Sequence, residues 1–93
     1  MLLLLQVMEM ISKDNYHNIK RYVKHLSKPQ IKQLCSDMEL TDLETNLLLS
    51  SYDGELVVKV CMDNYISETT YTKYIKIIYS KVYNYLNYIN TPF

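Results

Sequence analysis

Apolar residues recur at intervals of three and four along most of this chain, which is the spacing that buries one face of an α-helix. The stripe between Tyr16 and Leu26 shows the pattern well, with Lys20, Arg21 and Lys24 on the opposite side. Similar stripes follow and predict helices packed around one core. The inward positions predicted for the first four helices are Tyr16, Ile19, Val23, Leu26, Ile31, Leu34, Cys35, Met38, Leu43, Leu47, Leu48, Leu56, Val57, Val60 and Cys61.

Polar residues mark where these helices begin and end. Residues 12–15 and 67–70 are rich in Ser, Thr, Asp, Asn and Glu, whose side chains can accept hydrogen bonds from the free N–H groups of a helix start. Ser27 and Thr41 are each followed, three residues on, by Gln or Glu, and this is the spacing of a capping box. Gly54 can adopt the left-handed conformation of a sharp turn. We therefore expect four capped helix starts and a helix end at Gly54.

The last helix is expected to be long. Its inward seam has spacings of four, three, four, three and four, which is a heptad pattern. The seam positions are Tyr71, Ile75, Ile78, Val82, Tyr85 and Ile89. A helix from Ser67 to Ile89 would be about 34 Å long. The helix before it should stop near Asp63–Asn64, where the apolar pattern ends.

Composition agrees with an all-α fold. The chain has 1 glycine and 2 prolines in 93 residues, so residues that break helices are scarce. Its length suits a single domain with one core. We predict a small bundle of five to six helices that ends in the long C-terminal helix.

Residues 2–11 are apolar on nearly all sides and predict either a buried helix or a partly ordered arm. Met8 and Met10 are alternative starts to Met1. The opening leucines lack a basic leader and a cleavage site, and they are far fewer than the ~20 apolar residues of a membrane span. We therefore expect a cytoplasmic protein that does not bind a membrane.

Nothing in the sequence predicts catalysis. Cys35 and Cys61 lie in apolar helical patterns and are expected to be free, buried thiols. Together with His17 and His25 they lack any recognised zinc-ligand spacing. The sequence also lacks a nucleophile motif and a phosphate-binding loop. We expect neither an enzyme nor a cofactor or metal.

Charge is unevenly distributed although the net charge is zero. Residues 13–32 contain six basic residues and one acid, and residues 33–68 contain eight acids and one base. Residues 69–93 contain three lysines and no acid. This distribution allows a local positive face on a neutral molecule, and also an acidic face that a protein partner could contact.

The middle of the chain carries a recognisable pattern. Leu40, Thr41 and Glu44 form a Leu-Thr-x-x-Glu opening, and Gly54 stands between two predicted helices. The further positions that fit the pattern are Val60, Cys61, Ser67, Thr70, Tyr71, Ile78, Lys81 and Val82. In this order and spacing, residues 40–82 resemble the C-terminal DNA-binding domain of LuxR-type regulators and, less closely, the last DNA-binding region of bacterial sigma factors.

The resemblance implies a helix-turn-helix whose recognition helix begins at Ser67 and enters the major groove. The DNA-contacting positions that it implies are Ser67, Thr69, Thr70, Thr72, Lys73 and Lys76. Periodicity independently places several of these between the inward seam positions. Thr69 and Thr72 stand where the family often has lysine or arginine, which lowers the expected attraction to phosphate.

The single domain then divides into an N-terminal helical extension (1–39), the helix-turn-helix (40–82), and a helix extension with a tail (83–93). The residues considered as additional phosphate contacts are Lys20, Arg21, Lys24 and Lys81. The residues considered for dimerisation are Val82, Tyr85, Leu86 and Ile89. The N-terminal helices could instead cover this part of the seam within one chain.

These features predict a transcriptional regulator of bacterial or phage type that binds double-stranded DNA as a homodimer. A dimer is expected because one weakly charged recognition helix reads too few base pairs to be specific. The alternative is a protein-interaction module, or a phage-type inhibitor, whose acidic helices at Asp37–Glu44 and Asp53–Glu68 contact RNA polymerase or a nuclease.

Overall fold

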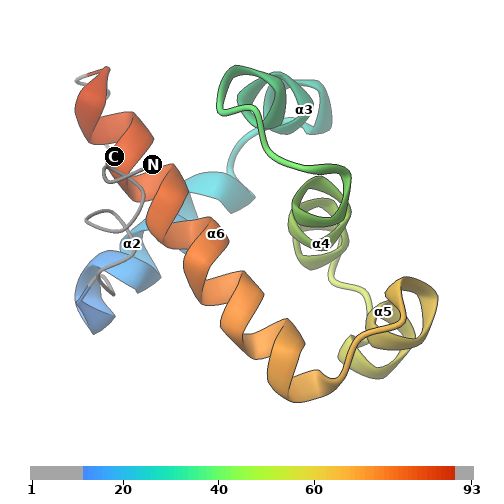
Figure 1. Cartoon of the computed structure of the whole chain (residues 1–93). Helices are drawn as coiled ribbons and strands as arrows, with labels where there is room; N and C mark the ends of the chain where they lie inside the picture. The colour runs from blue at the N-terminus through green and yellow to red at the C-terminus, as the bar shows by residue number, and fades with distance from the viewer. Residues whose placement is uncertain (1–11, 90–93) are drawn as a thin grey trace.

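One long helix, α6 (Glu68–Tyr88), runs diagonally through Figure 1, and shorter helices pack against it. The computed structural model describes residues 12–89, which form helices and connecting turns without any strand. The helices preceding α6 in this range are α2 (Lys13–Lys24), α3 (Lys28–Asp37), α4 (Asp42–Asp53) and α5 (Val57–Asn64). The predicted all-α class is thus confirmed for residues 12–89. The predictions for residues 1–11 and 90–93 lie outside this range.

Every predicted helix start has its hydrogen bond. The Ser12 hydroxyl accepts from the Asn15 N–H at 3.2 Å and opens α2. Ser27 opens α3 and Thr41 opens α4, each with both bonds of a capping box. The Ser67 hydroxyl accepts from the Thr70 N–H at 3.1 Å and opens α6. Such caps stabilise a helix by about 1 kcal/mol because they satisfy an otherwise unpaired donor.

Three helix ends share one geometry, in which a left-handed residue is followed by an N–H that bonds to the carbonyl five residues earlier. The left-handed residues are Glu39 (φ 54°), Gly54 (φ 73°) and Tyr65 (φ 57°). The returning bonds run from Leu40 to the Cys35 carbonyl and from Ile66 to the Cys61 carbonyl, and Glu55 makes the equivalent bond to Ser50. The left-handed turn at Gly54 was predicted, and α5 ends at Asn64 as expected.

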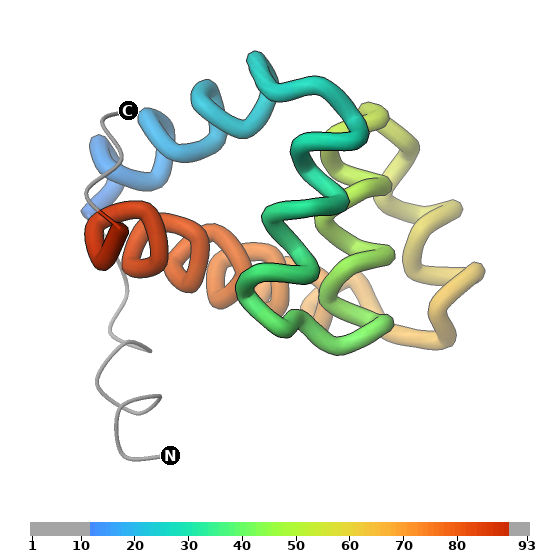
Figure 2. The backbone as a smooth tube through the Cα atoms, turned by 90° about the horizontal axis from the view of Figure 1, so that it is seen from above, coloured from blue at the N-terminus to red at the C-terminus, as the bar shows by residue number. Residues whose placement is uncertain are grey.

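The core lies where α2 and α4 approach α6 from different sides, and Figure 2 shows α2 and α6 diverging from a shared end of the molecule. The buried apolar residues are Ile19, Val23, Ile31, Leu34, Cys35, Leu47, Leu48, Val60, Cys61, Tyr71, Ile75, Ile78, Tyr79, Val82 and Leu86. Tyr16 of α2 packs edge-on against Tyr79 of α6, with ring centroids 5.5 Å apart. Asn15 donates to the Tyr83 hydroxyl at 3.0 Å. α2 therefore belongs to the same core as α6.

Two predictions about the inward face were wrong. Leu56 is 77% exposed and Val57 38% exposed, because Leu56 precedes α5 in an extended conformation and this short helix buries Val60 and Cys61 instead. Leu86, rather than Tyr85 or Ile89, is the last buried apolar residue of α6. Tyr79, which lies beside the predicted seam, is buried as well, and Tyr85 is half-buried and packs against the core. The buried face of α6 is therefore wider than the predicted seam.

Candidate nucleic-acid interface

The first turn of α6 offers free backbone donors. The Ser67 hydroxyl donates to the Thr70 hydroxyl at 3.0 Å and accepts the Thr70 N–H. The preceding amides of Glu68 and Thr69 have no hydrogen-bond partner within residues 12–89. Free N–H groups at a helix start favour an anion such as phosphate. Ser67 therefore acts first as the cap that holds these donors in place.

Four predicted DNA-facing residues of α6 are exposed: Thr69, Thr72, Lys73 and Lys76. They alternate with the buried Tyr71, Ile75 and Ile78, so one face of the helix is fixed by the core while the other meets solvent. The Thr72 hydroxyl donates to the Glu68 carbonyl at 3.0 Å. This bond satisfies the hydroxyl within the helix.

The two lysines of this face have no ion pair within the part of the chain that the structure describes. Within residues 12–89, neither Lys73 nor Lys76 has an acid within ion-pair distance. Lys28, Lys59 and Lys81, in contrast, each contact a carboxylate. The charge of the α6 face is consequently available to an external anion.

Two features make the same turn less suited to binding phosphate. Glu68 is an exposed acid in the first turn of α6. Thr70 is half-buried and its hydroxyl contacts Ser67, so it is less accessible than the other predicted positions. The basic end of this face therefore lies at Lys73 and Lys76, one to two turns into the helix.

Lys81 has a partner inside the protein. Its ammonium group donates to Glu44 of α4, a carboxylate that is only 6% exposed. Burial alone would raise the pKa of Glu44, but the hydrogen bonds from Lys81 and Thr41, together with the positive charge of Lys81, outweigh it and lower the pKa. The pair removes Lys81 from the candidate phosphate contacts and fixes α6 against α4.

A second basic surface lies on α2, and we call it the α2 basic surface. His17, Lys20, Arg21, Lys24 and His25 line a shallow, open hollow on this helix. No acid lines the hollow, and none of its three cations pairs with an acid in the described part of the chain. The predicted positions Lys20, Arg21 and Lys24 thus come together on one face.

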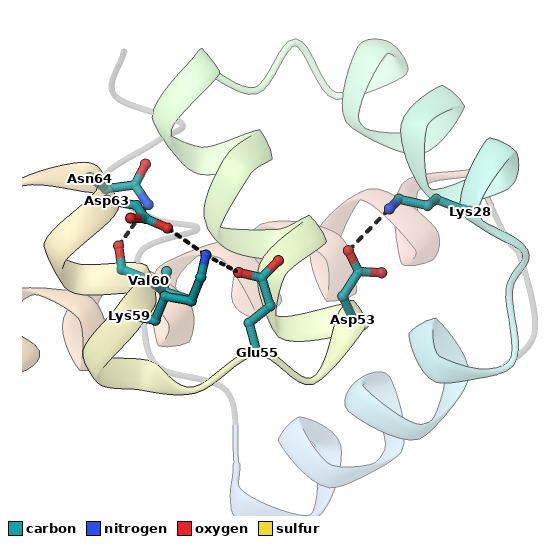
Figure 3. Close-up of polar contacts among 7 residues, drawn as sticks. All are labelled: Lys28, Asp53, Glu55, Lys59, Val60, Asp63 and Asn64. Carbon is teal, nitrogen blue, oxygen red and sulfur yellow. Dashed lines mark hydrogen bonds and ion pairs between the residues drawn. The ribbon is translucent and has the colours of Figure 1, made fainter.

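The acids of α4 and α5 are largely neutralised by nearby lysines. Figure 3 shows Lys59 between Glu55 and Asp63, at 3.7 Å and 2.8 Å, and Lys28 of α3 reaching Asp53 at 3.0 Å. These contacts hold the pKa of Lys59 above its ordinary value, with the hydrogen bond to Asp63 as the largest cause. Asp53, Glu55 and Asp63 therefore contribute little free charge to the predicted acidic face, whereas Asp37, Glu39, Asp42 and Glu68 are exposed and have no ion pair within residues 12–89.

The residues considered for dimerisation do not form one surface. Val82 is fully buried and Leu86 is 2% exposed, because α2 and the other helices cover this part of the seam within the chain. Tyr85 is half-buried, whereas Ile89 and the neighbouring Tyr88 are exposed. Of the four residues considered, only Tyr85 in part and Ile89 are therefore accessible to a second copy within residues 12–89.

Sequence reasoning missed an exposed apolar surface on α5, which we call the α5 apolar surface: Val58, Met62 and Tyr65. With Cys61 and Ile66 they line an open hollow at the turn between α5 and α6. The signal was present in the sequence. The run Leu56–Met62 has apolar residues on every side of a helix too short to bury them all.

Comparisons with protein-family models, curated proteins and solved structures found no match. Within residues 12–89, no helix combines the length and apolar character needed to cross a bilayer. The same residues contain no group of three or more His, Cys, Asp or Glu side chains placed to hold a metal ion.

Proposed function

We propose that this chain binds double-stranded DNA, with α5 and α6 as a helix-turn-helix and α6 as the recognition helix in the major groove. The observation that carries the proposal concerns Lys73 and Lys76, which have no ion pair within residues 12–89 and lie on the exposed face of a helix whose opposite face is fixed in the core. Cations without a protein partner keep their full attraction for phosphate or for the acceptor edge of guanine.

The turn between the two helices supports this arrangement. Only Tyr65, Ile66 and Ser67 separate α5 from α6. The hydrogen bond from the Ile66 N–H to the Cys61 carbonyl holds the turn between the two helices in one conformation. α4 packs against both helices and would brace the recognition helix from behind. Thr69 and Thr72 would then contact backbone or a thymine methyl beside the lysines.

The α2 basic surface would add phosphate contacts through Lys20, Arg21 and Lys24. Each such contact releases about one counterion, so affinity would depend steeply on salt. This contribution explains how a chain of zero net charge can bind a polyanion. Regulation of transcription would follow from sequence-specific binding, and a homodimer would contact two half-sites about 34 Å apart. Tyr85, Tyr88 and Ile89 are the accessible residues for such a dimer.

Selection from a random duplex library tests this function. Bound duplexes are recovered at low salt, amplified, and selected again at rising salt. We expect enrichment of a short motif, or of two copies of it if the protein dimerises. Recovery no higher than that from beads without protein would contradict the proposal.

The alternative of an inhibitor that imitates DNA is less well supported. Such a protein must present an array of unpaired negative charges, but Asp53, Glu55 and Asp63 are paired with Lys28 and Lys59. Glu44 is likewise paired with Lys81. The other four acids of the predicted face, Asp37, Glu39, Asp42 and Glu68, have no ion pair within residues 12–89, so about half of its acids remain free to meet a polymerase or nuclease.

A further inference from the structure

The three apolar side chains of the α5 apolar surface are largely exposed to solvent. Val58 is 56% exposed, Met62 71% and Tyr65 95%. The three residues are spaced four and three apart and line one hollow, with Cys61 and Ile66 beneath them. A contiguous exposed apolar surface of this kind marks a contact with another molecule.

Tyr65 supplies an independent observation. Its backbone is left-handed, with φ 57°, a conformation that costs a residue with a side chain about 1–2 kcal/mol. Glycine or asparagine would close this turn more readily. The chain instead places a bulky ring here and leaves it in solvent, although the ring contributes little to the core. Local strain combined with exposure points to a role outside the fold.

The edge of the hollow is acidic. Glu68 is the only charged residue among those that line it, and no acid–base pair within residues 12–89 neutralises this carboxylate. The nearest lysine in α5, Lys59, is already held by Glu55 and Asp63. A matching partner therefore presents a large apolar side chain beside a lysine or arginine.

We infer that the α5 apolar surface, with Glu68 at its edge, docks a segment of another protein that carries an apolar ridge flanked by lysine or arginine. The apolar side chain would sit over Cys61 and Ile66, between Met62 and Tyr65, and the cation would meet Glu68. Methionine suits such a surface because its flexible side chain adapts to the shape of the ligand. The inference does not depend on DNA binding.

A second copy of this chain does not offer that complement. Within residues 12–89, the basic surface on α2 has no exposed large apolar residue, and the exposed Tyr88 and Ile89 have no base beside them in the last turn of α6. The exposed Leu56 and Val57 lie near Lys59 in the sequence, but Glu55 and Asp63 already hold that lysine. Symmetric pairing of two α5 apolar surfaces would bring the two Glu68 carboxylates to the same interface, and like charges there are unfavourable. Residues 12–89 of a second copy therefore do not supply the complement, and the occupant that fits is a different protein.

A displayed library of random helical peptides tests the inference. Peptides are selected on the full chain and counter-selected on the Met62→Glu variant, and binding is then measured with the best synthetic peptide. We expect enriched peptides with large apolar residues next to lysine or arginine. Met62→Glu and Tyr65→Asn should each weaken binding by about tenfold or more, as for residues central to an interface. Glu68→Gln should weaken it several-fold and reduce its salt dependence.

Tyr88→Asn is the matched control, since Tyr88 is also a largely exposed aromatic residue, at 84%. It should leave peptide binding unchanged, and thermal melts should show that all four variants fold. The inference is overturned if no peptide survives counter-selection, or if acidic peptides are enriched. It is also overturned if sedimentation shows a dimer of the unmodified chain that Met62→Glu dissociates, because the surface would then be a self-interface.

Discussion

Glu44 and Lys81 join the start of α4 to the middle of α6 through a single carboxylate. One oxygen of Glu44 accepts the Thr41 N–H at 3.0 Å and completes the capping box, while the other accepts from the Lys81 ammonium group. The residue that caps one helix thus also fixes the position of another. In the proposed function this contact holds the recognition helix against its support.

Removing the charge of Glu44 should destabilise the fold in a pH-dependent way. Glu44→Gln keeps an acceptor for Thr41 but leaves Lys81 unpaired in a partly buried place, at a cost of about 2 kcal/mol near pH 7. Because the folded pKa of Glu44 is lowered, its contribution is present above the unfolded pKa of about 4.3 and is lost as pH falls through the folded pKa. Urea unfolding at a series of pH values measures the difference.

The exposed Asp42, in the same first turn, gives a control. Asp42→Asn should cost less than about 1 kcal/mol, because it removes only an interaction with the helix dipole. A difference between Glu44→Gln and the unmodified chain that stays constant from neutral pH to acid would contradict the proposed role of the ion pair.

Tyr79 should be the most sensitive aromatic residue of the core. It is 1% exposed, packs edge-on against Tyr16, and its hydroxyl lies 3.3 Å from the Ser51 hydroxyl. Tyr79→Ala should cost about 3–5 kcal/mol, whereas Tyr79→Phe, which loses only the hydrogen bond, should cost about 1 kcal/mol. Equal losses in thermal or urea unfolding would show that the ring does not join α2 to α6.

The two cysteines should resist modification until the chain unfolds. Burial is the largest cause that raises the pKa of both Cys35 and Cys61, so little thiolate is present at neutral pH and access is poor. We expect slow alkylation by iodoacetamide in buffer and fast alkylation in urea, read by mass spectrometry. Native alkylation of Cys61 at the rate of a free cysteine would show that its thiol is accessible from the hollow that it lines.

Substitutions at the left-handed residues Gly54 and Tyr65 should change the free energy of unfolding in opposite directions. Gly54 has open space around it, so Gly54→Ala should cost about 1 kcal/mol from backbone conformation alone. Tyr65→Asn should leave the unfolding free energy unchanged or raise it by up to about 1 kcal/mol, because asparagine tolerates this conformation better. A large loss on Tyr65→Asn would mean that the ring stabilises the fold, and would weaken the case for a docking role.

The helix starts could be predicted because their signals are local in the sequence. Contacts between residues far apart in the sequence could not be predicted. Ser27, Thr41 and Ser67 cap helices through residues three positions away, so the sequence reveals them. Left-handed turns at Glu39 and Tyr65 carry no glycine and give no comparable signal. The pairing of Lys81 with Glu44 joins residues 37 positions apart, and only the packing of α4 on α6 brings them together.

The candidate site was predictable to the same degree. Helical periodicity correctly placed Thr69, Thr72, Lys73 and Lys76 on the solvent side of α6. It could not show that Lys73 and Lys76 have no ion pair among residues 12–89, because this depends on where the other helices place their acids. Nor could it show that Tyr79 and Leu86, beside the predicted seam, are buried, because this depends on which helices pack against α6.

Fluorescence anisotropy with a labelled random duplex, measured across a salt series, tests the proposed DNA interface most directly. Lys73→Gln/Lys76→Gln is compared with Lys28→Gln/Lys59→Gln, which removes the same charge from lysines already held in ion pairs. We expect salt-dependent binding by the unmodified chain, and a loss of about two units of salt slope in the α6 variant only. Absence of binding at low salt, or equal effects of the two double variants, would contradict the account.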